Sequence, residues 1–320
     1  MSKEVKMWLV IATSLVLIGC IIFGGALYMA EFDFKKLQTT KYETNTHEIN
    51  EKFNGISINT DTADITFLLS DSKNCKIECF EETKEKHLVS IKDDTLFIEL
   101  ESQKLWYEYI GINFSTPKIT IYLPQKEYGK LEVKSSTGDI KIPKDFGFKD
   151  IDISLNTGDV DLFSSASNLI KIKTSTGDIN IKNISAGSLD LSVSTGKISV
   201  SNVICKGNAK FETSTGKTEL NDIKCKNLTS SGSTGNLLLN NVIAEGKLSI
   251  ERDTGNVKFE ACDAAEIFIQ TDTGYVSGTL LSEKVFITET DTGLVSVPKT
   301  INGGKCEITT DTGNIRVSYK

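Results

Sequence analysis

The dipeptide Thr-Gly recurs ten times in the C-terminal part of the chain, and its spacing constrains the fold more than any other feature. Neighbouring copies are always 19 or 20 residues apart. A constant period of this length is typical of solenoids, in which each repeat forms one coil and buries its apolar side chains only by stacking on the next. The ten glycines are Gly138, Gly158, Gly177, Gly196, Gly216, Gly235, Gly255, Gly274, Gly293 and Gly313.

Apolar residues alternate with polar ones on both sides of each Thr-Gly pair. The residue seven positions before the glycine is apolar in all ten repeats, and the residue two positions after it is apolar in nine. This alternation indicates half-buried strands, which would pair with the same strand of the next coil at about 4.8 Å. The sequence therefore predicts an all-β fold, a parallel β-solenoid over residues 131–320 with two main strands per coil and with Ile179 stacked on Ile198.

The corners of the coils use glycine and short polar residues. Glycine allows the positive φ of a sharp corner, and we expect the Thr hydroxyl before it to point inward or along the turn. The Ser, Asn or Asp before each Thr is expected to accept backbone N–H groups. A second corner carries Asn183, Asn202, Asp222 and Asn241 in successive coils. That column predicts hydrogen bonds along the stack.

The repeat pattern begins before the first Thr-Gly pair. The stretch "ISINTDTADITF" at Ile56–Phe67 fits the same frame with Ala63 in the glycine slot. After it the period is lost, and the pattern predicts a hairpin turning at Asp93–Asp94 and a strand at Pro117–Pro124. We interpret residues 53–130 as a β lobe that starts the solenoid and caps its first edge.

The first thirty residues have a different character. Met7–Ala30 contains no charged residue. This uncharged segment is longer than the roughly 20 residues that cross a bilayer as a helix. Lys3 and Lys6 precede it and acidic residues follow it, so the N-terminus (1–6) is expected in the cytoplasm and the remainder outside. The segment 7–30 is thus a predicted transmembrane anchor, and the polar residues 31–52 are a predicted stalk.

Two alternatives to an uncleaved anchor stay open. A cleaved signal peptide would have a shorter apolar core with small residues at the cleavage site. The stretch "LIGC" at Leu17–Cys20 resembles a bacterial lipobox, in which the cysteine is acylated after cleavage. The apolar run continues beyond Cys20, whereas lipoproteins turn polar there, so the pattern favours the anchor.

These features together resemble a known family. An apolar segment followed by "GGALYMAEFDFKKL", "ISINTDTADITF" and tandem "STGDI" and "DTGNV" units is similar to the bacterial putative-adhesin family, an extracytoplasmic domain of unknown function common in Firmicutes. The resemblance covers nearly all of the chain and implies a β-solenoid ectodomain on one membrane anchor. Some relatives belong to cell-envelope stress systems, which implies a signalling or accessory role. The family has no catalytic residues to carry over.

The residues give no support for an enzyme or a cofactor. The tripeptide "DTG" at Asp253, Asp272, Asp291 and Asp311 resembles the aspartic-protease motif, but Ser occupies the same slot in other repeats, which favours turn capping. Calcium between these stacked carboxylates is an alternative, although the calcium-binding nonapeptide pattern is absent. A polysaccharide-active β-helix enzyme would need paired outward acids, and none stands out from the solvated face.

The cysteines, the histidines and the net charge bear on metal, disulfide and nucleic-acid binding. Two histidines and no CxxC pair or Cys/His cluster predict no metal site. Cys205 and Cys225 fall on a column of small residues, where small buried side chains are expected and a disulfide between neighbouring coils is the alternative. The formal net charge of −7 gives no electrostatic case for binding nucleic acid.

One region of the outer surface carries apolar side chains, whereas the rest is mostly polar. The repeats of Gly274 and Gly293 carry Phe268, Tyr275, Ile287 and Leu294 at outward positions where other repeats are mostly polar. We interpret this group as a candidate partner surface, with burial under a loop as the alternative. The aromatic segment "LWYEYIGINF" at Leu105–Phe114 is expected to be the local core of the lobe, with a binding loop or a membrane-facing rim as alternatives.

The sequence therefore predicts a non-enzymatic, membrane-anchored envelope protein that presents its solenoid to a protein or glycan partner. An accessory or sensor of envelope-stress signalling is the alternative, and a polysaccharide-active enzyme is the second. The chain ends seven residues after Gly313 with no obvious polar cap. An uncovered last coil predicts weak end-to-end self-association.

Overall fold

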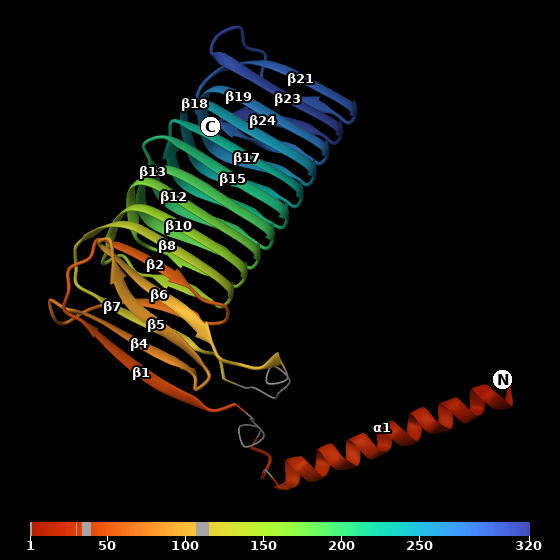
Figure 1. The fold of residues 1–320 in the computed structure, drawn as a ribbon. Helices are drawn as coiled ribbons and strands as arrows, with labels where there is room; N and C mark the ends of the chain where they lie inside the picture. Colours follow the sequence, from red (N-terminus) through yellow and green to blue (C-terminus); the bar gives the residue numbers. More distant parts are fainter. Residues whose placement is uncertain (1, 30, 34–39, 107–114) are drawn as a thin grey trace.

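The computed structural model describes residues 2–29, 31–33, 40–106 and 115–320. It contains one long helix, α1 (Lys3–Met29), and a mostly parallel β-solenoid of about ten turns (Figure 1). The helix buries none of its residues, and by its length and composition it is long and apolar enough to cross a membrane.

The predicted stacking is confirmed along the body of the solenoid. Ile179 pairs in parallel with Ile198, and Leu189 pairs with Ala209 of the next coil. The inward residues form buried columns of Ile, Leu, Val and Phe that constitute one continuous core. The strands of this body are β8 (Glu127–Thr137), β9 (Ile140–Ile142), β10 (Gly147–Thr157), β11 (Val160–Leu162), β12 (Ser165–Thr176), β13 (Ile179–Thr195), β14 (Ile198–Cys205), β15 (Asn208–Thr215), β16 (Thr218–Cys225), β17 (Asn227–Thr234), β18 (Leu237–Thr254) and β19 (Val257–Thr273).

Glycine is required at the first corner by close backbone approach. Gly216 has a φ of +142°, and a Cβ atom there would lie 1.7 Å from the carbonyl oxygen of Gly196 in the preceding coil. The Thr before each glycine faces outward, contrary to expectation. The buried hydroxyls stand three positions before the glycine instead, as where Thr271 donates to the Gly255 carbonyl at 3.3 Å.

The polar ladder at this corner also differs from the prediction. The residue after the glycine accepts the backbone N–H of the next coil, as where Asp159 N–H donates to Asp139 Oδ1 at 2.9 Å and Asp178 N–H donates to Asp159 Oδ1 at 2.7 Å. The residue before Thr was expected to accept backbone N–H groups of its turn, but the ladder between coils uses the position after glycine.

The Asn column at the second corner is confirmed. Asn183, Asn202, Asp222 and Asn241 all have positive φ. Asn202 Nδ2 donates to Asn183 Oδ1 at 2.8 Å, and Asn241 Nδ2 donates to Asp222 Oδ1 at 2.7 Å. Each residue therefore adopts the left-handed conformation of the turn, and its side chain links that turn to a neighbouring coil.

The buried cysteines of the solenoid form no disulfide. Cys205 and Cys225 are buried as expected, and all seven cysteines are free. The two therefore serve as small core side chains, and the alternative of a disulfide between them is wrong in this structure.

At the N-terminal end, the first coil along the chain is not the first coil of the stack. Strand β2 (Gly55–Asn59) pairs with β8 on one side and with β6 (Thr95–Ser102) on the other. Strand β3 (Asp64–Leu69) lies likewise between β9 and β7 (Lys118–Leu123). The coil formed by β2 and β3 therefore lies between two coils whose strands come later in the sequence.

A cap of antiparallel strands covers this end, as the sequence predicted. Strand β4 (Cys75–Glu82) pairs with β7 and strand β5 (Glu85–Lys92) pairs with β6, with the predicted hairpin turn at Asp93–Asp94. The predicted stalk is partly wrong, because β1 (Tyr42–Ile49) pairs antiparallel with β4 and belongs to the cap.

At the C-terminal end, too, the order of the coils in the stack differs from their order in the sequence. Strands β23 (Gly304–Thr312) and β24 (Ile315–Tyr319) lie between β19 and β20 (Val276–Leu280) on one side and β21 (Lys284–Thr292) and β22 (Val295–Ser296) on the other. The coil of Gly313 is therefore the penultimate coil of the stack. The expectation that it leaves an uncovered edge is wrong, because the chain returns to fill the gap and the outermost coil is that of Gly293.

Candidate functional site

The four residues of the predicted partner surface lie at the end of the solenoid opposite α1, but they are not on neighbouring coils. Phe268 of β19 and Ile287 of β21 each pair with Glu307 of β23. Tyr275 and Leu294 likewise flank Asn314, whose Oδ1 accepts the Leu294 N–H at 2.8 Å. The assumption of adjacent coils is wrong because the inverted last coil places a polar row between the apolar ones.

The exposed part of this group is a notch at the corner of the coils. Tyr275 is 57% exposed and Leu294 is 76% exposed, and together with Asn314 and Arg316 they line a cavity of about 250 Å³. The notch has apolar walls and a polar floor, so it can accept a partner group that is apolar at its sides and hydrogen-bonds at its centre.

The outer side of the same coils carries both apolar and charged side chains. Ile287 is 51% exposed. The Lys247 ammonium lies 5.4 Å from the centre of the Phe268 ring and partly covers it, and Glu307 between the two forms an ion pair with Lys305 at 2.6 Å. Phe268 is therefore the least available of the four side chains.

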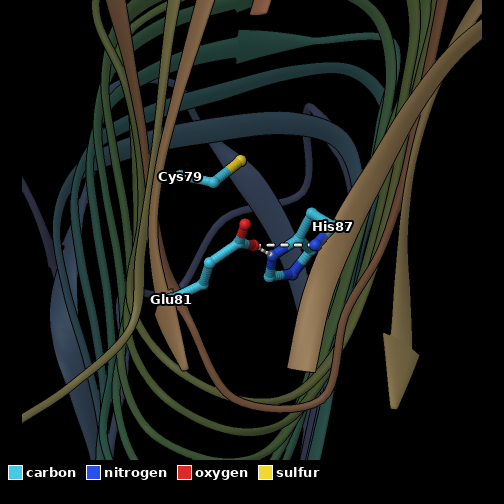
Figure 2. A group of neighbouring side chains, drawn as sticks. All are labelled: Cys79, Glu81 and His87. Carbon is cyan, nitrogen blue, oxygen red and sulfur yellow. Dashed lines mark hydrogen bonds and ion pairs between the residues drawn. The ribbon is translucent and has the colours of Figure 1, made fainter. Parts of the chain in front are cut away.

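A second group, which the sequence reasoning missed, lies buried in the cap. Cys79 and Glu81 point inward from β4, and His87 points toward them from β5 on the opposite side of the interior (Figure 2). Their sulfur, oxygen and nitrogen atoms all lie within 4.8 Å of one another, and all three residues are buried. In the part of the chain that the structure describes, this is the one group with the donors and spacing of a metal site.

Hydrogen bonds fix the orientation of this cluster. His87 Nδ1 lies 2.7 Å from Glu81 Oε2, and its Nε2 lies 2.8 Å from Thr60 Oγ1 in the first solenoid coil. The backbone N–H of His87 also donates to Glu81 Oε2 at 2.7 Å, and Asn45 Nδ2 donates to Oε1 at 2.8 Å. Because a carboxylate oxygen only accepts, Nδ1 carries the proton of the bond to Glu81, and Nε2 shares the second bond with the Thr60 hydroxyl.

Burial and these contacts act on the pKa values in opposite directions. Desolvation by burial, aided by the Glu81 charge, raises the pKa of Cys79 to about 12. Desolvation also tends to raise the pKa of Glu81, but the hydrogen bonds from His87 and Asn45 outweigh it and lower that pKa. The resting cluster therefore holds an ionised carboxylate beside a protonated thiol.

A cavity of about 230 Å³ reaches this cluster from the surface. Glu81 and His87 line it together with Lys104, which forms ion pairs with Glu82 and Glu85. Thr60, His87 and Glu81 have the order of a nucleophile, base and acid, but Thr60 is buried and does not line the cavity. The arrangement suits ion binding better than attack on a substrate.

Two other predicted sites are the "DTG" carboxylates and the aromatic segment at Leu105–Phe114. The "DTG" carboxylates form no convergent group of metal-binding donors among the described residues. In the aromatic segment, Leu105 and Trp106 are exposed, while residues 107–114 lie outside the described residues.

Comparisons with known proteins identify the family of this chain. No curated protein matches it. A crystal structure described as a putative adhesin from Bacteroides fragilis is 17% identical, with 87% of this chain and 97% of that chain covered and a TM-score of 0.43. A structure described as a putative lipid binding protein from Parabacteroides distasonis is 18% identical, with coverages of 75% and 97% and a TM-score of 0.48.

A structure described as a putative cell adhesion protein from Clostridium sporogenes is 14% identical, with coverages of 88% and 100% and a TM-score of 0.22. At these scores the solved structures carry no argument about function. The family profile of the toastrack domain DUF4097 matches residues 53–318, which is most of the chain. The protein therefore belongs to the toastrack DUF4097 family.

Proposed function

We propose that this protein is a non-enzymatic envelope protein, anchored by residues 7–30 with its N-terminus in the cytoplasm, that binds a protein or glycan partner at the far end of its solenoid. The observation that carries this proposal is the position of the exposed apolar side chains. Tyr275, Ile287 and Leu294 lie on the last coils of the stack, and α1 lies beyond the opposite end (Figure 1).

The chemistry of this end supports partner binding. An exposed apolar group with polar neighbours is typical of interaction sites, and aromatic or large aliphatic side chains contribute most of the binding energy at such sites. The notch between Tyr275 and Leu294 adds a concave surface with Asn314 and Arg316 available for hydrogen bonds. The coils between the two ends serve as a rigid spacer.

The test compares retention of the purified chain, lacking α1, on envelope preparations from the organism that encodes it. We expect the double variant Tyr275→Ser/Leu294→Ser to be retained at least about tenfold more weakly than the unaltered chain, which corresponds to about 1.4 kcal/mol. The matched control is Ile204→Ser, an exposed apolar residue on β14 in the middle of the solenoid.

Equal retention of both variants would refute a binding role for this end. Fractionating the envelope distinguishes the partner classes, because a glycan partner survives protease treatment and a protein partner does not. Recovery of a histidine kinase or a transporter alone, after cross-linking in intact cells, would favour the accessory role in envelope-stress signalling.

A further inference from the structure

We propose that Cys79, Glu81 and His87 bind one Zn²⁺ ion, which links the cap strands β4 and β5 to each other. The three residues present one thiol, one carboxylate and one imidazole to a common point, from two consecutive strands that do not pair with each other. Figure 2 shows the three side chains converging inside the coil.

The donor set selects the ion. Zn²⁺ binds thiolate, imidazole and carboxylate ligands in tetrahedral sites, whereas Ca²⁺ and Mg²⁺ require shells of oxygen. The cavity beside Glu81 and His87 gives an ion a route from solvent and leaves room for water as the fourth ligand. A cap that is otherwise a small sheet gains rigidity from such a link.

The hydrogen bonds show how the ion would be accommodated. It replaces the proton between His87 Nδ1 and Glu81 Oε2, and the ring then carries its proton on Nε2, where it donates to Thr60 Oγ1 at the existing distance of 2.8 Å. Ligand atoms on a tetrahedral zinc lie roughly 3.3 Å apart for bonds of about 2.0 Å. The two atoms, now 2.7 Å apart, therefore separate by only about half an ångström.

The charge of the cluster also favours this ion. Binding of Zn²⁺ releases the thiol proton of Cys79 to solvent, so that one dication balances one thiolate and one carboxylate. Thr60 and Asn45 then hold the ligands from behind, as outer partners do in zinc sites.

The second histidine belongs to the same layer. His47 on β1 pairs with Ile77 on β4, so its side chain lies on the face that carries Cys79. Its Nε2 atom is buried and has no hydrogen-bond partner. Both histidines of the chain thus lie on the inner side of the cap, although the site as proposed requires only His87.

The experiment uses the full-length chain in detergent, stripped with a chelator and then dialysed against Zn²⁺. We expect one zinc per chain by elemental analysis, and a raised Tm that the chelator reverses. Substitution of Co²⁺ should give the visible absorption of a tetrahedral site with a sulfur-to-metal charge-transfer band. The variants Cys79→Ser and His87→Gln should weaken zinc binding at least tenfold, and Cys262→Ser, a buried core cysteine on β19, should leave it unchanged.

A folded chain that retains no zinc would overturn the proposal, as would zinc binding that Cys79→Ser leaves intact or selective retention of another metal. If Cys79→Ser does not fold, Thr60→Val supplies the second test, because it keeps all three ligands. Loss of this outer partner should reduce zinc affinity by roughly 10- to 100-fold, and unaltered affinity would contradict the proposed geometry.

Discussion

Ile267 of β19 pairs in parallel with Cys306 of β23, although one complete repeat of the sequence, carrying β21 and β22, lies between them along the chain. The hydroxyl groups show the same order, because Thr310 donates to the Gly274 carbonyl and Thr290 donates to the Gly313 carbonyl. Strand β23 and the first two residues of β24 are thus paired on both sides, and β21 with β22 forms the free edge next to them.

This free edge predicts where the protein self-associates. At millimolar concentration the chain without α1 should form weak end-to-end dimers, because β21 leaves backbone groups unpaired on its outer side. Val285→Lys on β21 should abolish the dimers by placing a charge at the edge, while Ile204→Lys in mid-solenoid should have no effect. Analytical ultracentrifugation checks this, and a strict monomer or equal effects of both variants would contradict it.

The corner glycines predict a sharp difference between two substitutions. Gly216→Ala should lower the free energy of unfolding by at least about 2 kcal/mol, because its φ is +142° and the new Cβ would meet a backbone carbonyl. Gly147→Ala should stay within about 0.5 kcal/mol, because the nearest atom to its Cβ lies at 3.8 Å. Urea denaturation measures both, and equal losses would argue against the stacked corners.

A buried arginine predicts a stabilising substitution. Arg252 is 4% exposed, and its Nε and Nη1 atoms have no hydrogen-bond partner, so desolvation lowers its pKa to about 10. The guanidinium fills the space beside Gly232, and Ser230 accepts its one hydrogen bond at 2.8 Å. Arg252→Met should raise the free energy of unfolding by about 1–3 kcal/mol because it removes a buried charge and keeps the volume.

The control for this substitution is Arg316→Met on β24, where the arginine is exposed. It should change the free energy of unfolding by less than about 0.5 kcal/mol. A loss of stability in Arg252→Met would mean that the guanidinium has a partner of its own in solution.

The lowered pKa of Glu132 predicts one part of the pH dependence of the free energy of unfolding. Hydrogen bonds from Lys130 and Lys134 lower its pKa to about 2, against an ordinary value of 4.5. Because the folded-state pKa is depressed, this contribution is present above pH 4.5 and is lost as the pH falls toward 2. Both lysines are more than half exposed, so the contribution stays below about 1 kcal/mol.

The measurement compares urea denaturation of the unaltered chain and Glu132→Gln at pH 7 and near pH 2. The unaltered chain should be the more stable at pH 7, and the difference should close at the lower pH. A difference that persists at low pH would show that Glu132 acts through packing instead of charge.

The sequence was sufficient to predict the stacked columns but not the order of the coils. The period of 19 or 20 residues fixes which residues share a column, so the pairing of Ile179 with Ile198 followed directly. The repeats share one pattern of inward apolar residues, so the period alone does not say which of the repeats of Gly293 and Gly313 is outermost. The buried cluster was missed because Cys79 and His87 carry no metal-binding spacing and meet only where two strands that do not pair with each other face the same interior.

Coil order is also the basis of the proposed function, since it decides which side chains stand at the far end. Under mild oxidation, Ile267→Cys should form a disulfide with the native Cys306, because neighbouring parallel strands place the two Cα atoms about 4.8 Å apart, within the range that a disulfide spans. Phe286→Cys is the positive control, since Phe286 and Cys306 are neighbours in either order. Peptide mapping should find both cross-links; a cross-link from Phe286→Cys alone would contradict the inverted last coil.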